Sequence, residues 1–169
     1  MKARDLEQQL FDAIKDLNNN AVKVLIAEGV NVNVDYHSFP GAWGTPLITA
    51  IARALPLTVS TLLDAGADIN MPSTNSNMTP LMGACYNKNA SEVVKLLLYR
   101  GADPLFGFSP WRSALYWASQ PQKNRKTLKL LLPYYTTSYL KCFIVGVDSA
   151  PARAVALQEF RRRVRESIV

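Results

Sequence analysis

The side chains that carry the most chemistry in this chain are aromatic rings in expected loops and arginines near the C-terminal end, not a set of catalytic groups. His37 is the only histidine, and Cys85 and Cys142 are far apart in the sequence. A Cys-His or Ser-His pair would depend on one loop residue, and a zinc site lacks ligands in number and spacing. The glycines are typical of helix ends and follow no strand, so no phosphate loop is indicated. We therefore expect a protein that is not an enzyme, without a metal, a cofactor or a small-molecule substrate.

Two expected loops combine aromatic and charged side chains, which is typical of protein interfaces. These side chains are Tyr36, His37, Phe39 and Trp43 in residues 35–43, and Trp111 and Arg112 at the end of residues 104–112. Tryptophan, tyrosine and arginine dominate the energetics of protein interfaces. For the first loop two readings stay open: its rings bind a partner, or Phe39 and Trp43 fold back over the following helix.

A cluster of arginines marks the C-terminal end of the chain. The net charge is +6, and residues 149–169 hold five arginines against two glutamates. Four of these arginines are close together: Arg161, Arg162, Arg163 and Arg165. They fit a solvated helix face, a site for an acidic protein partner, or contacts to the phosphates of nucleic acid or anionic lipid. No groove-reading motif accompanies them.

The elements that position these residues are short helices in pairs. Thr45 and Pro46 are typical of a helix start, and Gly66 is typical of a helix end. The Thr-Pro-Leu start returns at Thr79, 34 residues later, and a related Ser-Ala-Leu start follows at Ser113 after the same interval. Helices this short are marginal alone, and a fixed period of this size indicates a stacked repeat array.

These motifs resemble those of the ankyrin repeat family. They appear as Thr45-Pro46-Leu47 with Gly66-Ala67-Asp68-Ile69-Asn70, and as Thr79-Pro80-Leu81 with Gly101-Ala102-Asp103. The histidine that follows this leucine in the family is replaced by Ile48, Met82 and Tyr116, which removes a polar contact but keeps the spacing. The resemblance implies an all-α solenoid of about four helix pairs over residues 5–135.

The chain divides into a repeat array and a C-terminal cap. We expect the array over residues 1–135, with repeats at 5–33, 34–70, 71–103 and 104–135, and a capping segment at 136–169. Polar side chains on the first repeat fit a terminal cap. Residues 136–148 are ambiguous between strand and helix. A basic, non-repeat capping helix is expected over residues 149–168, with Ser149 as its N-cap.

The resemblance implies non-catalytic protein recognition, as an adaptor, inhibitor or effector. The binding surface in such proteins is the concave face, formed by the finger loops and the first helices. The candidate contacts are Tyr36, His37, Trp43, Arg53, Met78, Tyr86, Trp111 and Arg112. The alternative is binding of nucleic acid or anionic membrane through the basic C-terminal helix. The basic balance of the chain favours an acidic partner in either case.

The composition also bears on whether the protein is disordered, spans a membrane or is secreted. Hydrophobic residues make up 49% and charged residues 19%, which excludes a disordered chain. No apolar run is long enough to span a bilayer, and the first residues are too polar for a signal peptide. We expect a cytoplasmic protein, or one in a host-cell cytosol if it is a secreted effector. Both cysteines are expected to be buried free thiols.

Overall fold

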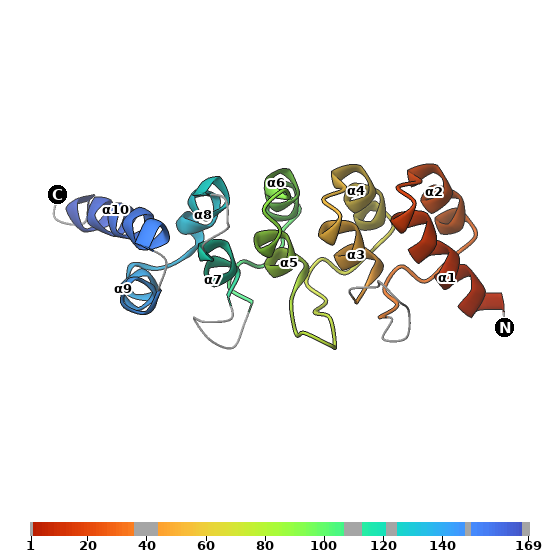
Figure 1. The fold of residues 1–169 in the computed structure, drawn as a ribbon, viewed down its shortest axis with the longest axis horizontal. Coiled ribbons are helices and arrows are strands. Elements are labelled where there is room, and N and C mark those ends of the chain that lie inside the picture. Colours follow the sequence, from red (N-terminus) through yellow and green to blue (C-terminus); the bar gives the residue numbers. More distant parts are fainter. Residues whose placement is uncertain (1, 36–43, 107–112, 121–124, 148–149, 167–169) are drawn as a thin grey trace.

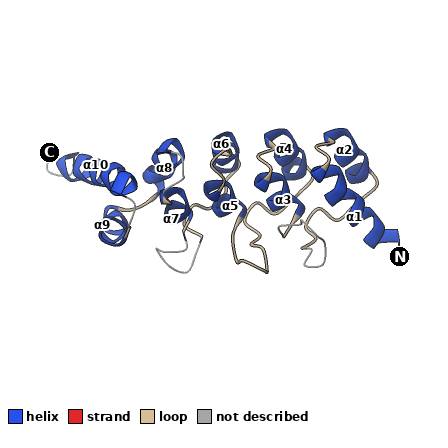
Figure 2. Cartoon of the chain, in the orientation of Figure 1, coloured by secondary structure: helices blue, strands red, loops and turns tan. Residues whose placement is uncertain are grey.

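The computed structural model describes residues 2–35, 44–106, 113–120, 125–147 and 150–166, and within them the chain forms helices and loops without a strand (Figures 1 and 2). The helices follow one another in pairs along a row (Figure 1). The pairs are α1 (Lys2–Lys15) and α2 (Asn19–Ala27), α3 (Pro46–Ala52) and α4 (Pro56–Asp64), α5 (Pro80–Tyr86) and α6 (Ser91–Tyr99), α7 (Ala114–Ser119) and α8 (Arg125–Leu131), and α9 (Thr137–Gly146) and α10 (Ala150–Glu166). The predicted all-α repeat fold is confirmed.

The first helices of pairs two, three and four begin in the same way. The hydroxyl oxygens of Thr45, Thr79 and Ser113 each accept a hydrogen bond of 3.2 Å from the backbone N–H three residues further on. After both threonines, a proline supplies the helical φ without adding an N–H that lacks a partner. These caps satisfy amides that have no partner inside the helix, so they fix where each first helix begins.

The second helices of the first three pairs end at glycines with a left-handed backbone. Gly29, Gly66 and Gly101 have φ of +84°, +87° and +88°, a conformation that favours glycine at helix ends. In the fourth pair this ending is absent. There α8 runs directly into a short 3₁₀ helix, Leu132–Tyr134, that contains Pro133.

The pairs stack in two layers that share one core. The first helices α1, α3, α5 and α7 contact one another in sequence, and so do the second helices α2, α4, α6 and α8. Leu47, Leu81 and Leu115 hold equivalent places in three first helices, and each is at most 1% exposed. Because each short helix buries its apolar face against the neighbouring pairs, the stack supplies the stability that a single pair lacks.

Asparagine side chains join successive repeats at their exit loops. The Asn33 amide donates to the carbonyl of Gly66 at 3.0 Å and accepts from the N–H of Asp68 at 2.7 Å. Asn70 accepts from the N–H of Asp103 at 2.9 Å. Each bond crosses from one repeat to the next, so the loops are held in the same register as the helices.

The junction with the fourth pair uses a tyrosine instead. Leu105 occupies the place of the asparagine and is exposed. The hydroxyl of buried Tyr135 donates to the carbonyl of Pro104 at 2.5 Å and accepts from the N–H of Leu115 at 3.3 Å. Burial raises the pKa of Tyr135, so its hydroxyl keeps the proton that it donates.

The fifth pair, α9 and α10, follows the four repeat pairs. Most of the ambiguous segment 136–148 is helical: Thr136 accepts a hydrogen bond of 3.2 Å from the N–H of Tyr139, and α9 follows with Leu140 and Phe143 buried. Helix α10 packs on both α9 and α8. In Figure 1 it is seen along its length, whereas α4, α6 and α8 are seen nearly end-on. The outer layer therefore changes direction at its last helix.

Candidate partner-binding surfaces

Three aromatic rings from neighbouring first helices form one cluster. Tyr86 of α5 packs edge-on against Trp117 of α7, with ring centroids 5.4 Å apart and an interplanar angle of 86°. Trp117 makes a similar edge contact with Tyr116 at 5.6 Å. Tyr116 and Trp117 are half-buried against the core, whereas 51% of Tyr86 is exposed. The edge contact orients the Tyr86 ring and leaves half of it open to a partner.

Arg53 is exposed but also joins two first helices. Its guanidinium donates to the carbonyl of Lys15, at the end of α1, at 3.2 Å. Asn87, one repeat later, donates in the same way to the carbonyls of Ile51 and Ala52 at 3.1 and 2.9 Å. Both side chains therefore cap the preceding first helix, a role that sequence reasoning did not assign to Arg53.

Met78 is half-buried at the end of the finger formed by residues 71–78. The N–H of Ser73 donates to the carbonyl of Met78 at 2.9 Å, and the N–H of Asn77 donates to the carbonyl of Ser73 at 2.7 Å. At the base of the finger, Gly44 has φ +111°, and a Cβ added there would lie 2.7 Å from the Ser73 hydroxyl oxygen. The finger extends below the first helices in Figure 1.

The other predicted contacts on the fingers lie outside the described residues. They are Tyr36, His37, Trp43, Trp111 and Arg112. Their part in recognition stays a prediction, and so do the two readings of the loop at 35–43. Of the eight candidates for partner binding, the structure places Arg53, Met78 and Tyr86, which come from consecutive elements of the first-helix layer and its finger.

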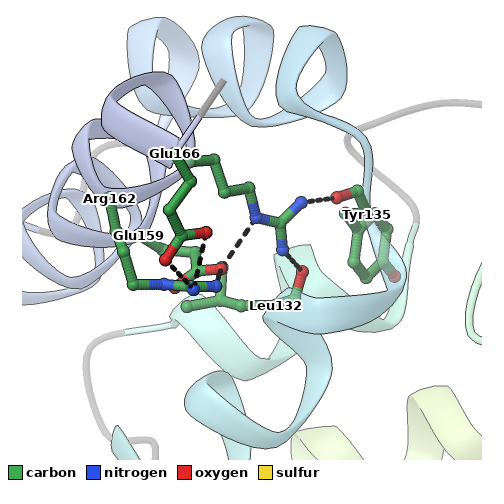
Figure 3. Close-up of polar contacts among 6 residues, drawn as sticks. Leu132, Tyr135, Glu159, Arg162 and Glu166 are labelled. Carbon is green, nitrogen blue, oxygen red and sulfur yellow. Dashed lines mark hydrogen bonds and ion pairs between the residues drawn. The ribbon is translucent and has the colours of Figure 1, made fainter. Parts of the chain in front are cut away.

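Two of the four clustered arginines are engaged within the molecule (Figure 3). Arg162 pairs with Glu159 and Glu166, each at 2.7 Å. Arg163 pairs with Glu159 at 2.7 Å and donates to the carbonyl of Leu132 at 2.6 Å and to that of Tyr135. Arg163 thus donates hydrogen bonds to carbonyls at the end of the fourth pair, where the capping glycine is absent. This long-range contact is invisible in the sequence pattern.

Glu159 organises these two arginines. Its carboxylate lies between both guanidinium groups, and its side chain is only 16% exposed. The hydrogen bond from Arg162, helped by that from Arg163, lowers the pKa of Glu159 to about 2. The carboxylate is therefore charged at all ordinary pH values and holds Arg163 in its capping position.

A groove of about 940 Å³ lies between α8 and α10, and we call it the α8–α10 groove. Its charged lining consists of Lys129, Arg161, Arg162, Arg165, Glu159 and Glu166. Its apolar lining includes Leu132, Pro133, Val155 and Leu157. Arg161 and Arg165 are exposed and form no ion pair with any residue that the structure describes. Lys129 and Leu157 were not predicted, because they meet these arginines only once α10 folds back onto α8.

The cysteines differ in environment. Cys85 is buried and free, as expected, and burial raises the pKa of its thiol far above the usual range, so it is inert at neutral pH. Cys142 is also free but exposed, which corrects the expectation that both thiols are buried. It lies on the solvent side of α9, whose inward face is occupied by Leu140 and Phe143.

The described part of the chain contains no group of three or more His, Cys, Asp or Glu side chains that could hold a metal ion. Among its helices, none is both long enough and apolar enough to cross a bilayer. Polar side chains such as Thr45, Asn33 and Arg163 make caps, bonds between repeats and ion pairs, which stabilise a scaffold.

Comparison with known proteins agrees with this geometry. A family model described as ankyrin repeats in three copies matches residues 10–106. No curated protein matches the chain. The matched residues run from α1 to the loop after α6, and the stack continues beyond them through two further helix pairs. The chain belongs to the ankyrin repeat family.

Proposed function

We propose that this protein is a non-catalytic recognition module that binds a partner protein through its concave face. Ankyrin repeats are in general protein–protein interaction modules. The observation that carries the proposal is the edge-packed pair of Tyr86 and Trp117, in which a half-exposed ring is held in a defined orientation. Such a ring adds contact area with little further loss of conformational entropy, which is typical of interface anchors.

We propose that the finger loops contribute further anchors to this recognition. Trp43, Trp111 and Arg112 are proposed as further anchors, because their residue types dominate interface energies. In the sequence, Trp43 lies two residues before Thr45, the N-cap of α3, and Trp111 and Arg112 directly precede Ser113, the N-cap of α7. We expect Trp111→Ala or Arg112→Ala to weaken binding by about 1 to 3 kcal/mol.

Site-specific photo-cross-linking tests the location of the surface. A benzophenone side chain at position 86 should capture a partner in native cells. The matched control places the same group at position 99, because Tyr99 is 87% exposed on α6, in the opposite layer. Capture from position 86 and not from 99 supports the proposal. Equal capture from both positions, or capture from 99 alone, would rule out the concave face as the site.

Binding of a polyanion through α10 is the alternative, and it has weaker support. Arg162 and Arg163 are committed to carboxylates and carbonyls, which leaves Arg161 and Arg165 of the original four. Two cations on a helix supply little of the counterion release that drives nucleic-acid binding. Heparin binding by the full chain, compared with a chain that ends at Asp148 and measured at several salt concentrations, tests this alternative. Absent or salt-insensitive binding would dismiss it.

A further inference from the structure

We propose that the α8–α10 groove is a second binding site, which takes an acidic segment with apolar side chains from a partner protein. The groove lies between α8 and α10. Both helices are in the upper row of Figure 1, whereas the finger of residues 71–78 extends below the first helices. The groove is therefore separate from the proposed concave-face site, and its occupation does not depend on Tyr86.

The charges of the groove select a negatively charged segment. Lys129, Arg161 and Arg165 face it without an ion-pair partner among the described residues. Glu159 and Glu166 also line it, but Arg162 binds both of them. The lining thus holds four cations and two carboxylates, a net charge of +2. This net positive charge attracts a protein segment with a few carboxylates. The two glutamates would repel the continuous row of phosphates in a nucleic acid.

The apolar lining favours a protein segment over nucleic acid or a lipid headgroup. Leu132 and Val155 are buried beneath the groove, and Pro133 and Leu157 reach its surface between the charged side chains. A cavity of about 940 Å³ has room for several side chains at once. An amphipathic segment can place leucines on this floor and carboxylates beside the cations.

The change of direction at α10 explains why the groove exists. Helices α2, α4 and α6 each pack against the next second helix in the outer layer. Helix α10 also contacts α8, but its axis points along the row of helix pairs, whereas the axis of α8 is seen nearly end-on (Figure 1). Part of α8 and of the following 3₁₀ helix is therefore left uncovered beside the arginine-bearing side of α10.

Fluorescence anisotropy with the full chain and three labelled probes tests this proposal. The first probe is a decapeptide in which Glu-Glu and Leu-Leu pairs alternate, the second has serines in place of the leucines, and the third is a thymidine decanucleotide. We expect the leucine peptide to bind most tightly. The double variant Lys129→Glu, Arg165→Glu should weaken that binding about tenfold. Lys141→Glu, an exposed charge change on α9 outside the groove, should weaken it less than about twofold.

Each other result overturns the proposal. Equal or tighter binding of the serine peptide or the oligonucleotide would show attraction by charge alone. An equal loss with Lys141→Glu would show that the groove is not the site, and absence of binding by the leucine peptide would dismiss it altogether. Self-association that the double variant abolishes, detected by sedimentation, would identify a second copy as the occupant. Thermal melts establish that the variants are folded.

Discussion

Replacing Arg163 with methionine removes the side chain that substitutes for a glycine cap at the end of the fourth helix pair. Arg163 donates to the carbonyls of Leu132 and Tyr135 and is paired with Glu159. Methionine keeps a long apolar side chain of similar reach but cannot donate. The substitution therefore leaves two carbonyls without their donor and one carboxylate with a single arginine partner.

The expected loss of stability is about 2 to 4 kcal/mol. A hydrogen bond to a charged group contributes about 1.5 to 3 kcal/mol net. The two bonds to the carbonyls and the one to Glu159 are lost, but Glu159 keeps its bonds to Arg162, which limits the cost of the third. The Arg163 side chain is 18% exposed, so water reaches part of the site and offsets part of the loss. Because repeat arrays lose cooperativity when one end weakens, the effect should concentrate in residues 125–166.

Urea unfolding measures the total change in free energy, and hydrogen exchange locates it. We expect faster amide exchange in α8, α9 and α10, with α3 and α4 less affected. Arg161→Met is the matched control, because Arg161 is exposed on the same helix, and it should change stability by less than about 0.5 kcal/mol. Equal effects of the two substitutions would refute the capping role of Arg163.

Three further predictions concern stability. The pKa of Glu159 is about 2 in the folded state against an ordinary 4.5. Its contribution to stability is therefore present above about pH 4.5 and lost as the pH falls toward 2. In Glu159→Gln, the melting temperature should depend less on pH over this range than in the unchanged protein. Gly44→Ala should destabilise the fold by about 2 to 4 kcal/mol, because the added Cβ would clash with Ser73. Gly66→Ala is the control and should cost about 1 kcal/mol, because its Cβ would enter open space. Equal shifts of the urea midpoint in the two variants would refute this reasoning. Asn33→Ala removes two bonds between repeats and should lower stability by about 1 to 3 kcal/mol in urea unfolding. No change would show that water replaces those bonds.

The repeat fold was predictable because its signals are local. A hydroxyl at Thr45, Thr79 and Ser113, and a glycine at the end of three second helices, act within a few residues of their own position. The segment 136–148 was ambiguous, since its apolar and β-branched residues suit either a buried strand or a helix. The side chain of Thr136 and the burial of α9 against α10 decide for a helix.

The candidate sites were less predictable because they depend on contacts between distant residues. Arg53 is attractive as an exposed arginine, yet its bond to the carbonyl of Lys15 comes from the stacking of α1 and α3. Arg163 belongs to a basic run in the sequence, but the fold turns it toward the carbonyls of Leu132 and Tyr135. The spacing of charges along a helix does not reveal which of them a neighbouring element will use.

The affinity of a cross-linked partner for Tyr86→Ala, compared with Tyr99→Ala, tests the central claim most directly. Both substitutions remove an exposed tyrosine ring, one beside Trp117 and one in the opposite layer. Recognition through the concave face predicts a loss of about 1 to 3 kcal/mol for Tyr86→Ala and less than about 0.5 kcal/mol for Tyr99→Ala. Unchanged affinity of Tyr86→Ala, or an equal loss in both variants, would contradict it.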